Sequence, residues 1–256
     1  MEQLKYILGS ILFAPLMPIV LTQGNRIRKT FPRLPEALYP EGTVGEGPPF
    51  RLVCLGESTM ACVGIDTHEN GFAGNFSKHL SKRLKRQVDW KVYAKSGLTA
   101  EMVRKQLVPQ IKEQACDLIL IALGGNDTFQ LNSPNQWTEQ IELLIASIRL
   151  KFKDTPILFA TMPPIHTFPA FTGPIRLVLG QLVSLHGDGL NRLIKDHPNI
   201  YFDPQKIDLN YWLNKYPGHQ KEEFYSDGLH PSSLTYQIWG AELAELIEQQ
   251  HFNSIE

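Results

Sequence analysis

The sequence predicts an α/β protein built on a parallel β-sheet of about five strands. Short apolar runs such as Leu118–Leu123 alternate along the chain with longer segments that carry apolar residues at helical spacing. Successive parallel strands need a crossover, and right-handed helical crossovers place helices on both faces of the sheet. Polar residues also follow several of the apolar runs, at the sheet edge where open α/β proteins place their functional sites.

Turn-forming residues bound five predicted strands, and helical segments separate them. The strands are Arg51–Leu55, Val88–Tyr93, Leu118–Leu123, Pro156–Ala160 and Ile200–Phe202. The helical segments are Phe72–Leu84, Thr99–Gln114, Gln136–Phe152, a stretch around Ile175–Asp196, and Leu234–Gln249. In the third helical segment, the apolar residues that recur on one helix face are Ile141, Leu144, Ile145 and Ile148. We expect these elements to form one globular domain over residues 50–256.

Three predicted strands each lead into a residue that can carry chemistry. Ser58 follows the first strand, Gly97 the second and Asn126 the third. The carboxyl ends of parallel strands meet at one edge of a sheet, so we expect these residues to lie close together. Asp227 and His230 precede the last helix, which must pack back across the sheet, and we expect them at the same edge.

Ser58, Asp227 and His230 are the residue types that nucleophilic catalysis by serine requires. A serine hydroxyl is a weak nucleophile until a neighbouring base takes its proton and a third group orients that base. His230 is the candidate base, and Asp227 is the candidate orienting group. Ser58 also has a simpler interpretation as the N-cap of a following helix. The alternatives near Asp227 and His230 in the sequence are Asp203, Asp208 and His219.

Four short motifs resemble the signature blocks of the SGNH hydrolase superfamily, also called GDSL esterases and lipases. They are Gly56-Glu57-Ser58, Gly97, Gly124-Gly125-Asn126-Asp127, and Asp227 with His230, in the family's order over about residues 50–249. The resemblance implies a three-layer α/β/α, flavodoxin-like fold. It also implies hydrolysis of carboxylic esters through an acyl-serine intermediate and a Ser-His-Asp triad. The chain departs from the family pattern at Glu57, where the family usually has aspartate.

The same resemblance implies an oxyanion hole made by the backbone N–H groups of Ser58 and Gly97 and by the side-chain amide of Asn126. Such donors stabilise the charge that develops on the substrate oxygen. Gly97 and Asn126 also have an alternative interpretation as ordinary turn residues. A proline-rich, aromatic stretch follows the fourth strand, and its Phe168 and Phe171 are candidate substrate-pocket residues. The alternative is that these two rings pack on the core.

The substrate is left open by the sequence. The esters that the resemblance implies have short acyl, aryl or lipid groups, and thioesters are included. A carbohydrate O-acetylesterase is the alternative within the superfamily. A non-catalytic binding module on the same fold is the alternative from another class, and the presence of Ser58, Asn126, Asp227 and His230 favours an enzyme.

Charge balance and cysteine usage argue against several function classes. A formal net charge of −1 over 256 residues argues against nucleic-acid binding. Cys54, Cys62 and Cys116 lack metal-type spacing, and we expect free thiols. No P-loop pattern and no Gly-x-Gly-x-x-Gly follows the first strand. We therefore expect no metal and no cofactor, and the oligomeric state is not predicted.

The N-terminal region differs from the rest of the chain. Tyr6–Thr22 is uncharged, and basic residues follow it at Arg26, Arg28, Lys29 and Arg33. As a helix this run would extend roughly 25 Å, a little less than the roughly 30 Å hydrocarbon core of a bilayer, and two prolines would kink it. We expect residues 1–33 to be a membrane anchor, spanning or interfacial, and residues 34–49 to be a Pro/Gly-rich linker.

The charge distribution around this run bears on localisation. Basic residues on its C-terminal side favour a membrane-associated protein with a cytoplasmic catalytic domain. Two alternatives remain open: an anchor of opposite orientation with an exported domain, and a helix that packs on the globular domain. Because every candidate catalytic residue lies beyond Phe50, the sequence predicts that removing about the first 35 residues leaves an active domain.

Overall fold

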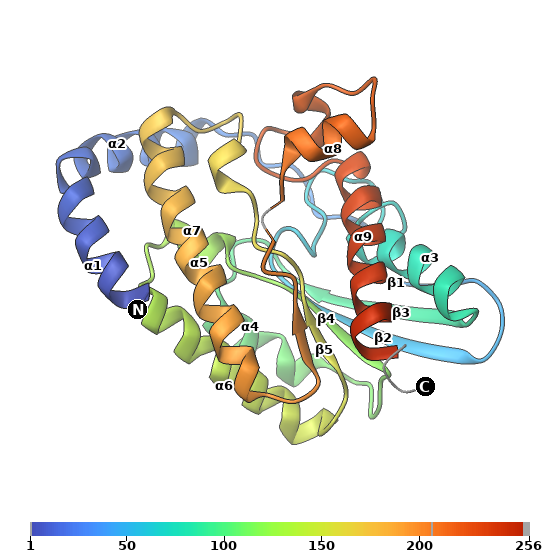
Figure 1. The fold of residues 1–256 in the computed structure, drawn as a ribbon. Helices are drawn as coiled ribbons and strands as arrows, with labels where there is room; N and C mark the ends of the chain where they lie inside the picture. The colour runs from blue at the N-terminus through green and yellow to red at the C-terminus, as the bar shows by residue number, and fades with distance from the viewer. Residues whose placement is uncertain (1, 206, 253–256) are drawn as a thin grey trace.

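The computed structural model describes residues 2–205 and 207–252, and a six-stranded mixed sheet lies at its centre (Figure 1). The strands are β1 (Glu41–Val44), β2 (Pro49–Gly56), β3 (Gln87–Ala94), β4 (Leu118–Ala122), β5 (Ile157–Phe159) and β6 (Ile200–Phe202). Their spatial order is β1-β3-β2-β4-β5-β6. Strands β2 to β6 are parallel, and β1 pairs antiparallel with β3. Counted along the chain, the five parallel strands follow the 2-1-3-4-5 order of flavodoxin-like folds, so the predicted fold class is confirmed.

Helices cover both faces of the sheet and give three layers. One face is covered by α3 (Phe72–Leu84) and α9 (Ser233–Ile247), and the other by α4 (Ala100–Gln106), α6 (Pro134–Phe152) and α7 (Gly173–Leu193) (Figure 1). Side chains of a strand point alternately to the two faces. In β2, Leu52 and Cys54 therefore join the core under α3 and α9, whereas Val53 and Leu55 join the core under α4 and α6. Two further short helices, α5 (Gly125–Phe129) and α8 (Leu209–Lys215), follow strands β4 and β6.

Strand β1 was not predicted, and it lies within the segment expected to be a linker. It forms the edge of the sheet, where Thr43 stands opposite Asp89 and its Oγ1 donates to Asp89 Oδ1 over 2.7 Å. Gly42 permits the pairing, because a Cβ at this position would lie 2.4 Å from the Trp90 ring. The predicted helix Thr99–Gln114 is also shorter than expected, since Pro109 cannot continue it and the chain forms a 3₁₀ turn there.

The N-terminal region forms two helices, α1 (Glu2–Phe13) and α2 (Met17–Thr30), joined by one 3₁₀ turn. Pro15 lies in the 3₁₀ turn, where its missing N–H cannot continue α1, and Pro18 lies in the first turn of α2, where proline is tolerated. The chain changes direction at this junction (Figure 1). The inner face of the pair packs on α7 in a third apolar cluster. Its members from the N-terminal helices are Phe13, Met17, Val20 and Ile27, and those from α7 are Ile175, Val178, Leu179 and Val183.

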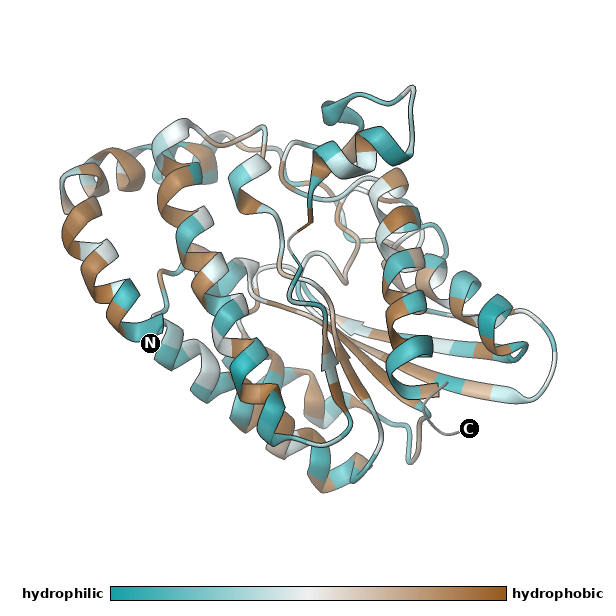
Figure 2. Cartoon of the chain, in the orientation of Figure 1, coloured by the Kyte–Doolittle hydropathy of each residue, from teal (hydrophilic) through white to brown (hydrophobic). Residues whose placement is uncertain are grey.

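The outer face of these helices is apolar and exposed. The exposed large apolar residues are Leu4, Ile7, Leu8, Ile11 and Leu12 of α1, with Ile19 and Leu21 of α2. Figure 2 shows the corresponding hydrophobic colour along α1, at the border of the molecule far from the C-terminal helix. By length and composition alone, Glu2–Thr30 is apolar enough to cross a membrane, and only 6% of its most apolar window is buried.

Candidate active site

Three parallel strands end level with one another and begin the candidate site. The last residue of β2, Gly56, stands opposite Ala94 of β3 and Ala122 of β4. A Cβ on Gly56 would lie 2.4 Å from the Ala122 carbonyl oxygen, so only glycine allows the chain to leave the sheet here. Ser58 follows two residues later and therefore emerges at the middle of the carboxyl edge.

Ser58 begins a series of turns and does not begin a helix. The next helix is α3, which starts at Phe72 and has Gly71 as its N-cap residue, so the N-cap interpretation of Ser58 is wrong. The Val63 N–H donates to the Ser58 carbonyl oxygen over 3.2 Å and closes this turn. Ser58 itself is half-buried, which leaves its side chain partly open to solvent.

Asp227 and His230 form a hydrogen-bonded pair in the loop before α9. His230 Nδ1 lies 2.7 Å from Asp227 Oδ2, and Asp227 Oδ1 accepts the backbone N–H groups of Leu229 and His230 over 2.9 and 2.8 Å. Burial acts to raise the pKa of Asp227, but the hydrogen bonds from His230 and Leu229 outweigh it and hold that pKa below its ordinary value. Asp227 is thus an ionised acceptor that orients the His230 ring through Nδ1. The second ring nitrogen of His230, Nε2, is left free to accept a proton.

The loop that carries His230 is fastened to the Ser58 turn. Ser226 Oγ contacts the Val63 carbonyl oxygen at 3.5 Å, and the Ser226 N–H donates to the His230 carbonyl oxygen over 2.9 Å. Within the described ranges, Ser58 Oγ and His230 Nε2 are not hydrogen-bonded to each other. Such catalytic hydrogen bonds are often long in unliganded enzymes and shorten when substrate binds.

The three candidate oxyanion donors differ in their availability. Across the part of the chain described here, the backbone N–H groups of Ser58 and Gly97 donate to no protein acceptor. Gly97 has φ +85°, and a Cβ there would meet nothing within 4 Å, so the backbone conformation rather than space requires glycine. Asn126 is engaged, because its side-chain amide donates to Glu57 Oε2 and to the Leu98 carbonyl oxygen, the latter over 3.1 Å.

Glu57 connects the Ser58 turn to the loop after β4. Its side chain is 3% exposed, and its carboxylate accepts the Gly125 N–H over 2.6 Å and the Asn126 N–H over 2.9 Å. Burial raises the pKa of Glu57 from its ordinary 4.5 to about 8, although the hydrogen bonds from Asn126 and Gly125 act in the opposite direction. The residue that departs from the family pattern therefore positions Asn126, a role that sequence reasoning did not assign to it.

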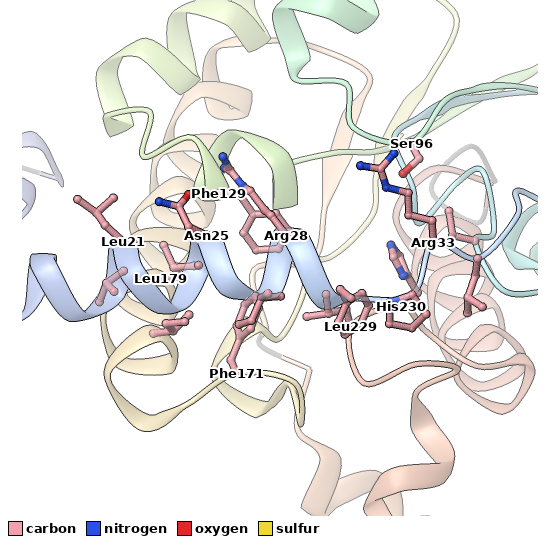
Figure 3. A pocket seen from close by; sticks show the side chains of 18 of the residues that line it. Leu21, Asn25, Arg28, Arg33, Ser96, Phe129, Phe171, Leu179, Leu229 and His230 are labelled. Atoms are coloured by element: carbon pink, nitrogen blue, oxygen red, sulfur yellow. The ribbon is translucent and has the colours of Figure 1, made fainter.

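A cavity of about 630 Å³ lies beside His230 (Figure 3). Its near end is formed by His230, Leu229, Val63 and Ser96. It then extends between α2 and α7, where the lining is mainly apolar and includes Leu21, Ile27, Ile175 and Leu179. Arg28 and Arg33 line the same cavity, and Figure 3 shows Arg33 close to Ser96 and His230.

The two candidate pocket phenylalanines occupy different positions. Phe171 lines the cavity beside His230. Phe168 does not line it, and instead packs on Phe171 with ring centroids 5.6 Å apart and borders a separate cavity of about 30 Å³. Phe168 thus packs behind Phe171, which forms part of the cavity wall. Of the two alternatives that the sequence left open, Phe171 fits a pocket residue and Phe168 fits a packing residue.

Sequence reasoning missed the contribution of the N-terminal region to this cavity. Residues 35–38 are paired with the segment after Ser58: the Gly64 N–H donates to Pro35 O over 2.9 Å, and the Ala37 N–H donates to Ala61 O over 3.0 Å. Leu21, Gly24 and other residues of α2 form one wall of the cavity. Removing the first 35 residues would remove this wall, so we no longer expect that deletion to leave the site intact.

Comparison with known proteins assigns the chain to a family of lipases and acylhydrolases. Residues 54–238 match the GDSL-like Lipase/Acylhydrolase family, and the chain belongs to this family. The chain is similar to the spore germination lipase LipC of Bacillus licheniformis, with 28% identity over 213 residues that cover 75% of this chain and 94% of that protein.

Two solved structures illustrate the shared fold. A putative GDSL-like lipase from Parabacteroides merdae has a TM-score of 0.59 and 13% identity, covering 79% of this chain and 97% of that one. LAE5, an α/β hydrolase enzyme from the metagenome of Lake Arreo in Spain, has a TM-score of 0.56 and 15% identity, covering 80% and 98% of the two chains. At these identities the likeness concerns the fold alone.

Proposed function

We propose that the chain hydrolyses carboxylic esters through an acyl-serine intermediate on Ser58. The observation that carries this proposal is the 2.7 Å hydrogen bond from His230 to a clamped, ionised Asp227, on a loop fastened to the Ser58 turn. Membership in a lipase and acylhydrolase family supports the same chemistry.

In the proposed reaction, His230 Nε2 takes the proton of Ser58 Oγ as that oxygen attacks the ester carbonyl carbon. Asp227 holds the Nδ1–H and stabilises the imidazolium that forms. The oxyanion accepts hydrogen bonds from the Ser58 and Gly97 backbone N–H groups, and from Asn126 once its amide exchanges one present partner. The imidazolium protonates the leaving alcohol, and a water molecule deprotonated by His230 then cleaves the acyl-serine ester.

The cavity supports an ester with an apolar acyl group as substrate. Its walls along α2 and α7 carry Leu21, Ile175, Leu179 and Phe171, which suit a hydrocarbon chain or an aryl ring better than a sugar. Turnover of p-nitrophenyl esters of graded chain length, measured beside a panel of acetylated sugars, tests this assignment. Activity confined to the sugar panel would instead identify a carbohydrate O-acetylesterase.

A fluorophosphonate probe tests the nucleophile directly, because it labels activated serines. The purified chain should become labelled, and Ser58→Ala should abolish labelling. Ser96→Ala is the matched control, since Ser96 lines the cavity. Among the described residues, its backbone N–H is the only group of Ser96 with a hydrogen-bond partner, the Glu36 carboxylate at 2.6 Å. Equal labelling of the parent and the Ser58→Ala variant would place the nucleophile elsewhere.

We further propose that the chain is membrane-associated through residues 2–30, with the catalytic domain on the cytoplasmic side. The basic residues after the apolar run support this orientation. Protease added to intact spheroplasts should then leave the domain uncleaved. Cleavage under those conditions would assign the domain to the exported side.

A further inference from the structure

The N-terminal helices take part in the candidate substrate site itself. Leu21, Asn25 and Arg28 of α2 line the cavity together with Leu179 of α7 and Phe171 (Figure 3). The cavity extends along α2 from Leu21 to the loop that carries His230. A substrate chain that reaches His230 through it would therefore contact α2 over much of its length.

This cavity opens next to the exposed apolar face of the helices. Leu21 lines the cavity, and its side chain is also 53% exposed at the surface. The other exposed apolar side chains of α1 and α2 continue this surface, and those on α1 include Leu8, Ile11 and Leu12. A hydrocarbon surface placed on this face would adjoin the distal end of the cavity.

Both ends of the helical pair are held by the globular domain. At the start of α1, Glu2 is ion-paired with Arg192 of α7. Near the middle of α2, Gln23 accepts a hydrogen bond from Thr172, and the chain after α2 pairs with the Ser58 turn. A helix that crossed a bilayer would have to break these contacts, whereas helices that lie along its surface keep them.

The positive charges beside the cavity indicate which kind of lipid bilayer the helices would bind. Arg28 and Arg33 line the cavity, and neither makes an ion pair in the ranges that the structure covers. Arg26 and Lys29 add positive charge to the same turn of α2. Unpaired cations next to an apolar face complement the phosphate groups of anionic lipids.

We propose that α1 and α2 lie along the surface of an anionic lipid bilayer, and that α2 forms one wall of the channel through which a lipid acyl chain reaches His230. The inference rests on the proposed ester hydrolysis and narrows its substrate to long-chain acyl esters of membrane lipids. In this proposal, α1 and α2 bind at the bilayer surface and do not cross the bilayer.

Vesicle binding tests the surface. The full-length chain should sediment with vesicles of equal parts phosphatidylglycerol and phosphatidylcholine at least tenfold more tightly than with phosphatidylcholine alone. Alkaline carbonate should release the chain from the vesicles. If the chain resists this extraction, it spans the bilayer and the interfacial placement is wrong. Replacing Leu8 and Leu12 together by Glu should reduce binding at least tenfold while the thermal unfolding midpoint stays close to that of the parent.

The matched control is Leu150→Glu. Leu150 is 89% exposed but lies near the end of α6, so this variant should bind vesicles as the parent does. If the Leu8 and Leu12 double variant binds as tightly as the control, the proposed membrane face is wrong.

Chain-length specificity tests the channel. Gly24 lies on the cavity side of α2, and a Cβ there would meet nothing within 4 Å, so Gly24→Phe places a ring in the channel without a backbone clash. The ratio of kcat/KM for p-nitrophenyl decanoate to that for the acetate should fall at least tenfold. Gly9→Phe is the control, because Gly9 also has room for a side chain but lines a separate cavity of about 160 Å³ that lacks His230.

The outcomes separate this inference from the function on which it rests. A chain that neither reacts with a fluorophosphonate nor hydrolyses any ester refutes the proposed function, whatever its behaviour with vesicles. A chain that hydrolyses p-nitrophenyl acetate but fails to bind anionic vesicles refutes the inference alone. If Gly24→Phe leaves the ratio of kcat/KM for the decanoate and the acetate unchanged, α2 does not form a wall of the channel.

Discussion

Glu57→Gln is the substitution whose effect on stability can be worked out most fully. Glu57 is buried, and its pKa is about 8 in the folded protein against an ordinary 4.5. Between these values the native state binds more protons than the unfolded chain, so unfolding becomes easier as pH rises. The penalty from this one group is about 1 kcal/mol at pH 5 and about 3 kcal/mol at pH 7. The stabilising effect of its proton is complete below pH 4.5 and is lost as pH rises toward 8.

The glutamine variant cannot ionise, so it lacks this pH-dependent loss. Its side chain has one acceptor oxygen, whereas Glu57 accepts the Gly125 N–H on one oxygen and the Asn126 N–H on the other. One of these hydrogen bonds is therefore lost, and we expect the variant to be about 1–3 kcal/mol less stable than the parent at pH 5. Because the parent loses about 2 kcal/mol between pH 5 and pH 7 through this carboxyl, the two stabilities should converge.

Urea unfolding monitored by tryptophan fluorescence at pH 5, 6, 7 and 8 measures these free energies. Glu101→Gln is the control, since Glu101 is an exposed carboxylate paired with Lys105 and should leave the pH slope of the parent unchanged. If the difference between the parent and Glu57→Gln is the same at pH 5 and pH 7, the Glu57 carboxyl does not carry a raised pKa and the reasoning fails.

The remaining predictions concern catalysis and, for Gly97, stability. Asp227→Asn keeps an oxygen for the backbone N–H groups but turns an amide toward His230, so kcat for p-nitrophenyl acetate should fall by about 10³–10⁴; full activity would remove Asp227 from its role. Asn126→Ala should lower kcat by about 10²–10³ with little change in KM, and a change in KM alone would make Asn126 a substrate-binding residue. Gly97→Ala should lower the free energy of unfolding by about 1–2 kcal/mol because of its positive φ, which thermal unfolding would detect. Activity should survive EDTA, and its restoration by a divalent ion after loss would contradict a metal-free mechanism.

The parallel sheet was predictable because its signals are local. Leu118–Leu123 is a continuous apolar run, and all of it is buried in the structure. Ser58, Gly97 and Asn126 could be placed at one edge because each follows such a run directly. Strand β1 carried no comparable signal, since Glu41–Val44 is only half-buried and contains a glycine fitted to Trp90.

The wall formed by α2 could not be predicted for a different reason. Val20 and Ile27 do repeat at helical spacing, but the helix is apolar on its outer face as well, so no narrow stripe marks the packed side. Nothing in a local pattern tells which later helix will cover such a segment. The Glu57 contacts with Gly125 and Asn126 join residues nearly seventy positions apart, so a local pattern could not predict them either.

The packing of α2 on α7 has a consequence for the order of events during synthesis. Helix α2 ends at Thr30 and α7 begins at Gly173, roughly 140 residues later. At about 5–20 residues per second, a ribosome needs roughly 7–30 s to make the intervening chain. For that interval the faces of Met17, Val20 and Ile27 have no α7 to cover them. The N-terminal helices can therefore complete their packing only after α7 has been synthesised, and a slower ribosome lengthens this delay.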